Sequence, residues 1–252
     1  MDNASRGAAI VTGGSRGIGA AIVKLLGASG YSVAFNYASD EAAARGVLDH
    51  LTRAGNRTVA IQADVSREAD ILRLFDIAQR ELGPLRALVN NAAITGGKAR
   101  VDEIDSTKLT QMLAVNVAGP MLCSREAVRR MSTRRGGLGG GIVNISSLAA
   151  RTGSAGEWVH YAASKGAVNT FTIGLAREVA GEGIRVNAVA PGLVDTGLHA
   201  ANGEPGRLAR LNPTIPMQRA GTPDEIAQGV LWLLSDAASY TTGTILEIGG
   251  GR

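Results

Sequence analysis

Hydrophobic and polar positions along the chain alternate between short apolar runs and longer stretches with a helical period. The short runs carry several Val, Ile or Ala and few charges, which is typical of strands buried on both faces. They are AAIVT (8–12), YSVAFN (31–36), RTVAIQ (57–62), LRALVN (85–90), GIVNIS (141–146), IRVNAVA (184–190) and TILEI (244–248). Helical patterns lie between them, at about 17–29, 40–54, 67–82, 107–132, 159–181 and 223–235. This alternation predicts one α/β domain over residues 1–252, with a doubly wound, mostly parallel sheet of about seven strands and helices on both faces.

Several predicted helices carry local end signals. Gly30, Gly55, Gly83 followed by Pro84, and Gly183 stand where helices are expected to stop. TPDE (222–225) offers a capping Thr, a Pro at the first helical position and a Glu three residues after the cap. These signals fix the limits of the helices more closely than the periodicity does.

Two stretches do not follow the alternation. RRGGLGGG (134–141) is Gly-rich and predicts a flexible surface loop that leads into the fifth strand. Residues 193–218 contain Gly and Pro breakers and show no clean period. A loop of that length inside a compact domain is often a binding loop, so we expect a substrate loop or lid there.

Composition excludes some classes of protein and leaves others open. Of the 252 residues 45% are hydrophobic and 19% charged, as in an ordinary globular protein, and the formal charge is +4. The basic residues are scattered and only 4% of residues are aromatic, so the sequence shows no basic stripe or stacking platform for nucleic acid. An anionic small ligand accounts for the positive charge equally well. The single cysteine, Cys123, lies in a helical pattern and is expected to be a small buried hydrophobic residue.

Targeting and membrane signals are absent from the sequence. The start, MDNASRGAAIV, lacks the apolar region of a signal peptide, and no run of about 18 apolar residues occurs. We therefore expect a cytoplasmic protein that uses neither membrane nor metal.

The first strand–helix unit carries a Gly-rich turn. AAIVTGGSRGIGAAIVKLL places Gly13, Gly17 and Gly19 where the backbone turns sharply and a ligand can approach. The following helix offers free N–H groups and the positive end of its dipole to a phosphate. The spacing differs from the usual G-x-G-x-x-G fingerprint, and a plain tight turn is the alternative, but its place in the first βα unit favours a dinucleotide site.

The residues after the second strand favour NADP(H) over NAD(H). An NAD site usually carries an acid about 20 residues beyond the Gly-rich turn, at the end of the second strand. Here that strand ends in Asn36, and Asp40 falls where the next helix begins. Arg16, inside the Gly-rich turn, offers a guanidinium to a 2′-phosphate.

Tyr161 and Lys165 are four residues apart in HYAASKGA (160–167), so they share one face of a helix. Lowering the pKa of a Tyr by two or three units requires roughly 3–4 kcal/mol of stabilisation of the phenolate. A Lys ammonium about 4 Å away supplies about 4 kcal/mol at an effective dielectric near 20. The pair is therefore either an ordinary packed Tyr beside a Lys or a phenol made acidic for proton transfer.

Several motifs in this order resemble the short-chain dehydrogenase/reductases, in the compact branch of that family, over essentially the whole chain. They are Thr12-Gly13 with Gly17 and Gly19, NNAA (90–93), Asn116, NISS (144–147), YAASK (161–165), APG (190–192) and the closing GTILEIGGG. The resemblance implies a single Rossmann-like domain, a nicotinamide cofactor, a small carbonyl or alcohol substrate and a homotetramer built on the helices at 107–132 and 159–181.

The resemblance also implies roles for four catalytic residues. Tyr161 would be the general acid in carbonyl reduction and the base in alcohol oxidation. Lys165 would hold the nicotinamide ribose and favour the phenolate, and Asn116 would hold a water that links Lys165 to solvent. Ser147 would polarise the substrate oxygen, whereas Ser146 points the wrong way. Ser147 and Tyr161 are fourteen positions apart, one more than is usual in the family.

Cofactor contacts follow from the same resemblance and from the Gly-rich turn. We expect them at Thr12, Gly13, Ser15, Arg16, Gly17, Ile18, Gly19, Asn36, Ser39, Asp64, Val65, Asn90, Ala92, Tyr161, Lys165, Pro191, Gly192, Val194 and Thr196. The substrate pocket is expected to include Ser147, Trp158 and Tyr161. His160 is expected to be a pocket-wall or surface residue, and Trp232 a core or subunit contact.

The leading functional hypothesis is an NADP(H)-dependent oxidoreductase that reduces a ketone or aldehyde reversibly. Reduction of 3-oxoacyl thioesters is an alternative, although Glu182 occupies a position where members with that activity often have a basic residue. A sugar or steroid dehydrogenase is a second alternative. A non-catalytic NADP-sensing regulator is a third, and the intact catalytic set counts against it.

Overall fold

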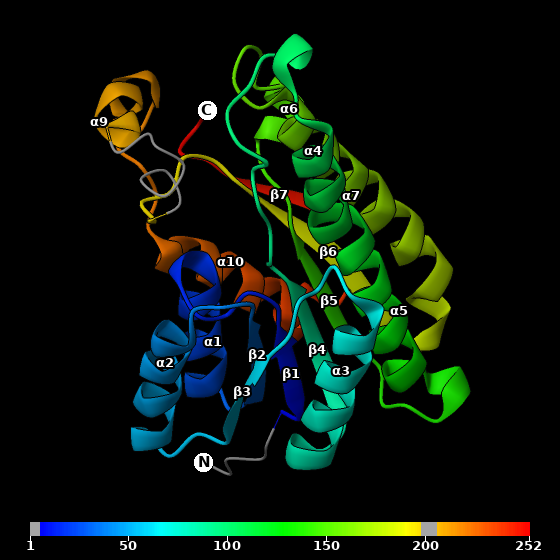
Figure 1. The fold of residues 1–252 in the computed structure, drawn as a ribbon. Helices are drawn as coiled ribbons and strands as arrows, with labels where there is room; N and C mark the ends of the chain where they lie inside the picture. The colour runs from blue at the N-terminus through cyan, green and yellow to red at the C-terminus, as the bar shows by residue number, and fades with distance from the viewer. Residues whose placement is uncertain (1–5, 198–205) are drawn as a thin grey trace.

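The centre of the computed structural model, which describes residues 6–197 and 206–252, is a sheet in which seven strands run parallel (Figure 1). The strands are β1 (Ala8–Val11), β2 (Ser32–Tyr37), β3 (Thr58–Gln62), β4 (Leu85–Asn90), β5 (Gly140–Ile145), β6 (Ile184–Pro191) and β7 (Ile245–Ile248). They lie in the order β3-β2-β1-β4-β5-β6-β7, so the direction of winding reverses between β1 and β4. Ligands of such sheets bind beyond the carboxyl ends of the strands at this switch point. The predicted doubly wound parallel sheet is confirmed.

Helices cover both faces of the sheet. The α-helices of the described residues are α1 (Gly17–Ala28), α2 (Glu41–Arg53), α3 (Glu68–Leu82), α4 (Ser106–Leu113), α5 (Gly119–Met131), α6 (Ala149–Thr152), α7 (Val159–Val179), α9 (Arg207–Leu211) and α10 (Pro223–Leu234). In Figure 1, α1, α2 and α10 cover one face, and α3, α5 and α7 cover the other. Each face has its own apolar core, one around Phe35 and Ile22 and the other around Phe75 and Met131.

The predicted helix ends are confirmed. Gly30, Gly55, Gly83 and Gly183 all have positive φ, between 74° and 90°, which residues with a Cβ rarely adopt. At the start of α10 the Thr222 hydroxyl accepts from the backbone N–H of Glu225, and the Glu225 carboxylate accepts from that of Thr222. The capping box read from TPDE therefore forms.

The helix predicted over 107–132 is interrupted. The π-helix η2 (Ala114–Ala118) separates α4 from α5. Pro120 has no N–H and so leaves the carbonyl of Asn116 without its usual helical donor, whereas Gly119 donates to the carbonyl of Ala114, five residues back. The wider turn gives the Asn116 side chain room to leave the helix for a neighbouring loop.

The two irregular stretches are more ordered than their sequences predict. The surface loop predicted over 134–141 packs closely at two of its glycines: a Cβ on Gly137 would lie 2.4 Å from the Met131 backbone, and one on Gly139 2.5 Å from the Gly183 carbonyl oxygen. These glycines allow a close turn, and Gly140 already begins β5. Within 193–218 the chain forms α9 and the 3-10 turn η5 (Asn212–Thr214), and residues 198–205 lie outside the described part. Elements of three to five residues are too short to show a period.

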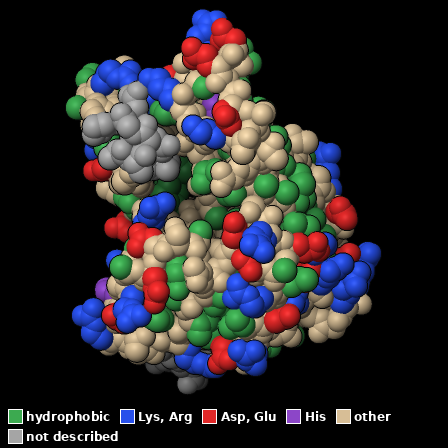
Figure 2. All heavy atoms as spheres, in the orientation of Figure 1, with side chains coloured by type: hydrophobic (Ala, Val, Ile, Leu, Met, Phe, Trp, Pro, Cys, Tyr) green, Lys and Arg blue, Asp and Glu red, His purple; other side chains and the backbone are tan. Residues whose placement is uncertain are grey.

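The surface carries mixed charges without a dominant patch on the face seen in Figure 2, which is hollowed beneath the upper left lobe where α9 lies in Figure 1. Among residues 6–197 and 206–252, none of the helices combines the length and apolar character needed to cross a membrane. Trp232 is 42% exposed on α10, which excludes the core position, whereas Cys123 is fully buried as predicted.

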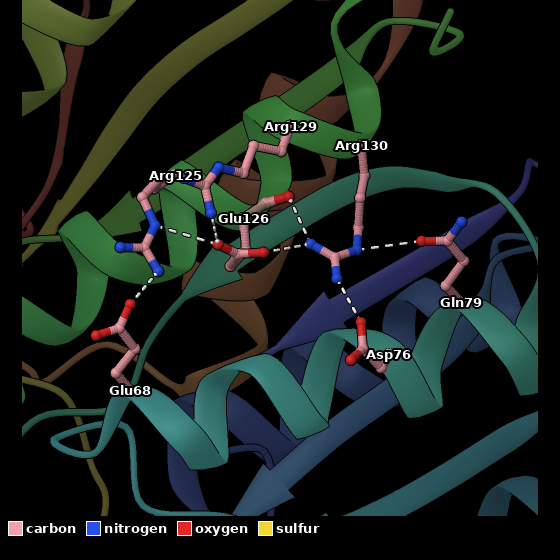
Figure 3. A network of polar contacts seen from close by, with 7 residues as sticks. All are labelled: Glu68, Asp76, Gln79, Arg125, Glu126, Arg129 and Arg130. Carbon is pink, nitrogen blue, oxygen red and sulfur yellow. Dashed lines mark hydrogen bonds and ion pairs between the residues drawn. The ribbon is translucent and has the colours of Figure 1, made fainter. Parts of the chain in front are cut away.

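An ion-pair network centred on buried Glu126 joins α5 to α3 (Figure 3). Only 3% of the Glu126 side chain is exposed, and its carboxylate lies within 3.1 Å of nitrogen atoms of Arg125, Arg129 and Arg130. Burial by itself would raise the pKa of Glu126, but the hydrogen bond and charge of Arg130, reinforced by the other two guanidinium groups, hold it below its ordinary value. Arg125 and Arg130 continue to Glu68 and Asp76 on α3, so one carboxylate organises the contact between the two helices.

Candidate active site

The Gly-rich turn lies at the carboxyl end of β1, at the switch point of the sheet. Gly13 and Gly17 have positive φ, 64° and 53°. A Cβ on Gly19 would lie 2.1 Å from the carbonyl oxygen of Gly13, so a side chain there would fill the turn. The backbone thus forms a cradle where α1 begins. Arg16, at the N-cap of α1, makes no side-chain capping hydrogen bond, so no capping side chain pairs with the first N–H groups of the helix.

The residues around this cradle come from the far side of the switch point. The Thr12 hydroxyl accepts from the backbone N–H groups of Asn91 and Ala92 at 2.9 and 3.0 Å. The Asn91 amide donates to the carbonyl oxygens of Thr12 and Gly13 at 2.9 and 3.0 Å. A Cβ on Gly17 would lie 3.4 Å from the Thr196 methyl group. Ala92 and Thr196, two of the residues expected to contact the cofactor, therefore flank the Gly-rich turn.

Asn36 supports the cradle from β2. Its buried side chain accepts from the backbone N–H of Gly13 at 3.0 Å and donates to the carbonyl of Ala63 at 2.7 Å. The side chain is thereby turned into the protein, whereas Ser39 and Arg16 are exposed. The Asp40 carboxylate accepts from the backbone N–H of Ala43 and caps α2, as its position in the sequence predicts. The carboxylate nearest to the end of β2 is thus engaged in the cap.

The remaining predicted cofactor residues line the same edge of the sheet or stand behind it. Asp64 follows β3 and accepts from the N–H and hydroxyl of Ser66, and Val65 is buried beside Gly119. The Asn90 amide donates to Asn144 at 2.8 Å and so joins β4 to β5 inside the protein. Ser15 and Ile18 are half-buried in the Gly-rich turn. Pro191 ends β6, Gly192 lies against Gly249, and Val194 forms an isolated bridge with Gly221.

Tyr161 and Ser147 meet at the carboxyl end of β5. Burial raises the pKa of the Tyr161 phenol to about 12, and a hydrogen bond to the Ser147 side chain lowers it by less than burial raises it. Ser147 lies two residues after the end of β5 and also accepts from the backbone N–H of Ala149 at 3.1 Å. The hydroxyl of Ser146 instead turns toward α7, where it donates to the Lys165 carbonyl. The structure thus places Ser147, rather than Ser146, beside the phenol.

Lys165 lies one helical turn after Tyr161 and only 3% of it is exposed. Its Nζ is 5.7 Å from the centre of the Tyr161 ring and donates to the Ile145 carbonyl at 2.7 Å. Burial lowers the pKa of Lys165 to about 8. The raised pKa of Tyr161 is opposite to the shift expected from Lys165 alone, because burial of the phenol outweighs an ammonium that lies over the ring face and is bonded elsewhere.

Asn116 is fully buried in η2 and connects three segments. Its amide oxygen accepts from the backbone N–H of Ile94 at 2.9 Å, and its nitrogen donates to the Ile94 carbonyl at 2.8 Å. The nitrogen also lies 3.1 Å from the hydroxyl of Ser164, the residue before Lys165. The side chain therefore holds the loop after β4 against the helix that carries Tyr161 and Lys165.

The segment with one extra residue between Ser147 and Tyr161 forms a tight, left-handed turn. Gly153, Ser154 and Gly156 all have positive φ, at 76°, 47° and 73°. This turn sets Trp158 at the N-terminal cap of α7, where it is 94% buried. His160 is also buried, and its Nε2 lies 3.1 Å from the carbonyl of Gly97, in agreement with a wall residue.

Four contacts around the site were not predicted from the sequence. Asn91 holds the Gly-rich turn, Ser164 bridges Asn116 to α7, the Ile145 carbonyl receives Lys165, and Arg207 stacks on Trp158. Asn91 is next to Asn90 in the motif NNAA. The motif marks this segment as part of the site, but it does not indicate which of the two side chains holds the Gly-rich turn. The other three contacts join residues at least 20 positions apart, and their residue types alone do not indicate them.

Together these residues place a glycine-lined turn and a Ser–Tyr–Lys group, of which Lys165 is buried, at the same end of one sheet. This is the arrangement of dinucleotide-dependent oxidoreductases. A family model described as enoyl-(acyl carrier protein) reductase matches residues 13–252. The chain belongs to the short-chain dehydrogenase/reductase family.

Similar proteins cover nearly the whole chain. The uncharacterized oxidoreductase YgfF of Escherichia coli K12 is 50% identical over 97% of this chain and 99% of its own. A short-chain dehydrogenase from Burkholderia cenocepacia J2315, solved in complex with NADP, is 33% identical with a TM-score of 0.91 over 99% of each chain. A blue fluorescent protein from a metagenomic library, in complex with NADPH, is 35% identical with a TM-score of 0.90 over 99% of each chain.

Proposed function

We propose that the protein reduces a ketone or aldehyde to an alcohol, reversibly and with NADP(H), and that Tyr161 exchanges the proton. The observation that carries this proposal is the hydrogen bond between Ser147 and Tyr161 beside Lys165, at the switch point of a sheet whose first turn is a phosphate cradle. Burial raises the pKa of the phenol to about 12, so Tyr161 carries its proton at neutral pH, as a general acid must.

The residues fit a dinucleotide. A Cβ on Gly19 would fill the turn that a diphosphate needs, and α1 begins there with free N–H groups. When bound, the reduced cofactor supplies the hydride. We assign Gly13, Gly17, Gly19 and Thr196 to the diphosphate, and Asp64 and Val65 to the adenine. The preference for NADP(H) is supported by the engaged Asp40 carboxylate, by exposed Arg16 in the Gly-rich turn, and by the NADP and NADPH in two similar structures.

The chain's own groups then perform the proton transfer. Ser147 donates to the carbonyl oxygen and holds it near the phenol, and Tyr161 gives its proton to that oxygen as negative charge develops there. The Lys165 ammonium stabilises the phenolate left behind. Asn116 keeps the loop after β4 and α7 in register, and in our proposal it also holds the water through which the proton is returned to Tyr161.

The test of this function is NADPH oxidation across ketones, aldehydes, sugars, steroids and 3-oxoacyl thioesters. We expect turnover of at least one class and a higher kcat/KM with NADPH than with NADH. Tight NADPH binding without turnover on the whole panel would point instead to a cofactor-sensing regulator. The class that turns over best decides among carbonyl reductase, thioester reductase and sugar or steroid dehydrogenase.

Two further expectations accompany the proposed function. We propose a homotetramer that uses the outer faces of α5 and α7, which analytical ultracentrifugation tests. We also propose that the protein acts in the cytoplasm, which fractionation of the source cells tests.

A further inference from the structure

Arg207, on α9, is a nearly buried arginine next to the helix that carries Tyr161. Its side chain is 10% exposed, and its guanidinium lies 4.2 Å from the centre of the Trp158 ring. Its Nη2 is 2.8 Å from a Glu157 carboxylate oxygen. The stacking and the ion pair together fix the position of the guanidinium.

The contacts of Arg207 leave two of its nitrogens without a partner. Nε and Nη1 are buried, and neither has a hydrogen-bond partner within the described part of the chain. The indole Nε1 of Trp158, beneath the guanidinium, is likewise buried and unpaired. All three atoms are donors and none can accept, so they match oxygen acceptors that residues 6–197 and 206–252 do not provide.

This group of donors lies one helical turn from the proposed acid. Trp158 caps α7, and its carbonyl accepts from the backbone N–H of Ala162 at 2.9 Å, so it is within the same turn as Tyr161. Arg207 therefore brings a fixed cation from α9 to the end of α7 that carries Tyr161.

The Glu157 carboxylate that pairs with Arg207 also lies near two other cationic side chains. Glu157 is also 3.8 Å from Lys98 and 3.9 Å from Arg210, so one carboxylate is shared among three cationic side chains. An arginine stays protonated at every pH at which a protein is folded. A guanidinium with free N–H groups and a shared counterion favours an anionic acceptor over a neutral one.

We propose that Arg207, supported by Trp158 and Glu157, binds a carboxylate on the substrate and so makes this enzyme selective for oxo acids. The inference rests on the proposed carbonyl reduction and names its substrate class. In this assignment the carbonyl group meets Ser147 and Tyr161, while the carboxylate at the other end of the molecule accepts from a free N–H group of Arg207 and from the Trp158 indole.

Paired substrates test the assignment. NADPH oxidation is measured with the five-carbon 2-, 3- and 4-oxo acids and with the methyl ester of each. The wild type is expected to prefer at least one acid to its ester by about 10-fold or more in kcat/KM. Arg207→Met should lower kcat/KM for that acid by about 100-fold, mainly through KM, and change the ester by less than about 3-fold. Arg207→Lys should recover part of the preference, and Arg134→Met, which removes an exposed arginine far from the site, should leave it unchanged.

Two outcomes would overturn the assignment: esters preferred to acids in the wild type, or an equal loss for acid and ester in Arg207→Met, which would make Arg207 a purely structural clamp. A binding assay separates this inference from the proposed function. In a Trp232→Phe background Trp158 is the single tryptophan, and pentanoate, but not pentanol, should change its fluorescence unless Arg207 is replaced by Met. Pentanoate binding without any carbonyl turnover would refute the proposed function alone. Carbonyl turnover without carboxylate selectivity or binding would refute this inference alone.

Discussion

Lys165 donates to the carbonyl of Ile145, at the end of β5, while its ammonium lies over the ring of Tyr161. The lysine thus fixes the distance between the strand that leads to Ser147 and the helix that carries the phenol. Burial favours the neutral form of both residues: it raises the pKa of Tyr161 to about 12 and lowers the pKa of Lys165 to about 8. The site therefore holds a protonated phenol beside a cation that gives up its proton more easily than an exposed lysine.

The lowered pKa of Lys165 predicts a pH-dependent stability. Between about pH 8 and its ordinary value of 10.5, the unfolded chain keeps the lysine proton and the folded protein releases it. The free energy of unfolding therefore rises with pH across this window. From pH 8 to pH 10 the lysine should add about 2 kcal/mol to the wild type relative to Lys165→Met, measured by urea denaturation.

The matched control for this measurement is Lys24→Met, which removes an exposed lysine from α1. Its difference from the wild type should be the same at both pH values. A constant difference for Lys165→Met as well would show that burial does not govern the charge of Lys165.

A side chain at position 19 should fill the Gly-rich turn and weaken the binding of NADPH. In Gly19→Ala the new methyl group would lie 2.1 Å from the Gly13 carbonyl oxygen and 2.6 Å from the Asn91 amide, so the turn must move. We expect the Kd for NADPH to rise at least about 100-fold by calorimetry, because several backbone contacts to the diphosphate depend on the turn.

Gly46 provides the control, because a Cβ there meets nothing within 4 Å on α2. Gly46→Ala should leave the Kd unchanged and raise the free energy of unfolding by about 0.5–1 kcal/mol through helix propensity. Unchanged NADPH binding in Gly19→Ala would place the cofactor elsewhere.

Replacing Arg16 should reduce the preference for NADPH over NADH. If its guanidinium holds the 2′-phosphate, Arg16→Ala should lower kcat/KM for NADPH by about 10- to 100-fold and leave the value for NADH nearly unchanged. Arg45→Ala, which removes another exposed arginine from α2, should change neither value. A wild type that prefers NADH, or an equal effect of Arg16→Ala on both cofactors, would refute the preference for NADP(H).

Removing the charge of Glu126 should lower the free energy of unfolding more than removing the charge of an exposed carboxylate. Glu126→Gln leaves Arg130, whose side chain is 16% exposed, without its buried counterion, and should lower the free energy of unfolding by about 3 kcal/mol. Glu41→Gln removes an exposed carboxylate from a surface pair with Arg45 and should cost less than about 0.5 kcal/mol. Equal effects in urea denaturation would mean that the network in Figure 3 contributes no more than a surface pair.

Local sequence signals were sufficient for the framework of the fold. Buried strands show as apolar runs because both faces of a parallel sheet are covered, and Gly30 or Thr222 marks a helix end because the backbone itself requires that residue type there. The π-turn at Asn116 escaped periodicity analysis, since one extra residue in a turn barely changes the hydrophobic pattern.

The site was predictable as a set of residue types and not as a set of contacts. The order of Ser147, Tyr161 and Lys165 indicated the family, yet the partners of these side chains come from tertiary structure. The spacing of Tyr161 and Lys165 predicts a lowered pKa for the phenol, whereas burial raises it, and the degree of burial cannot be read from the spacing. Arg207 gave no signal, since it becomes informative only where α9 meets Trp158.

Tyr161→Phe, assayed with the best substrate of the carbonyl panel, decides whether Tyr161 is the proton donor. The substitution keeps the ring beside Lys165 and removes only the hydroxyl. We predict a loss of kcat of at least about 100-fold, with the Kd for NADPH within about 3-fold of wild type. Tyr240→Phe, which changes a fully exposed tyrosine, should behave as wild type. If Tyr161→Phe retains wild-type turnover, Tyr161 is not the acid and the proposed mechanism is wrong.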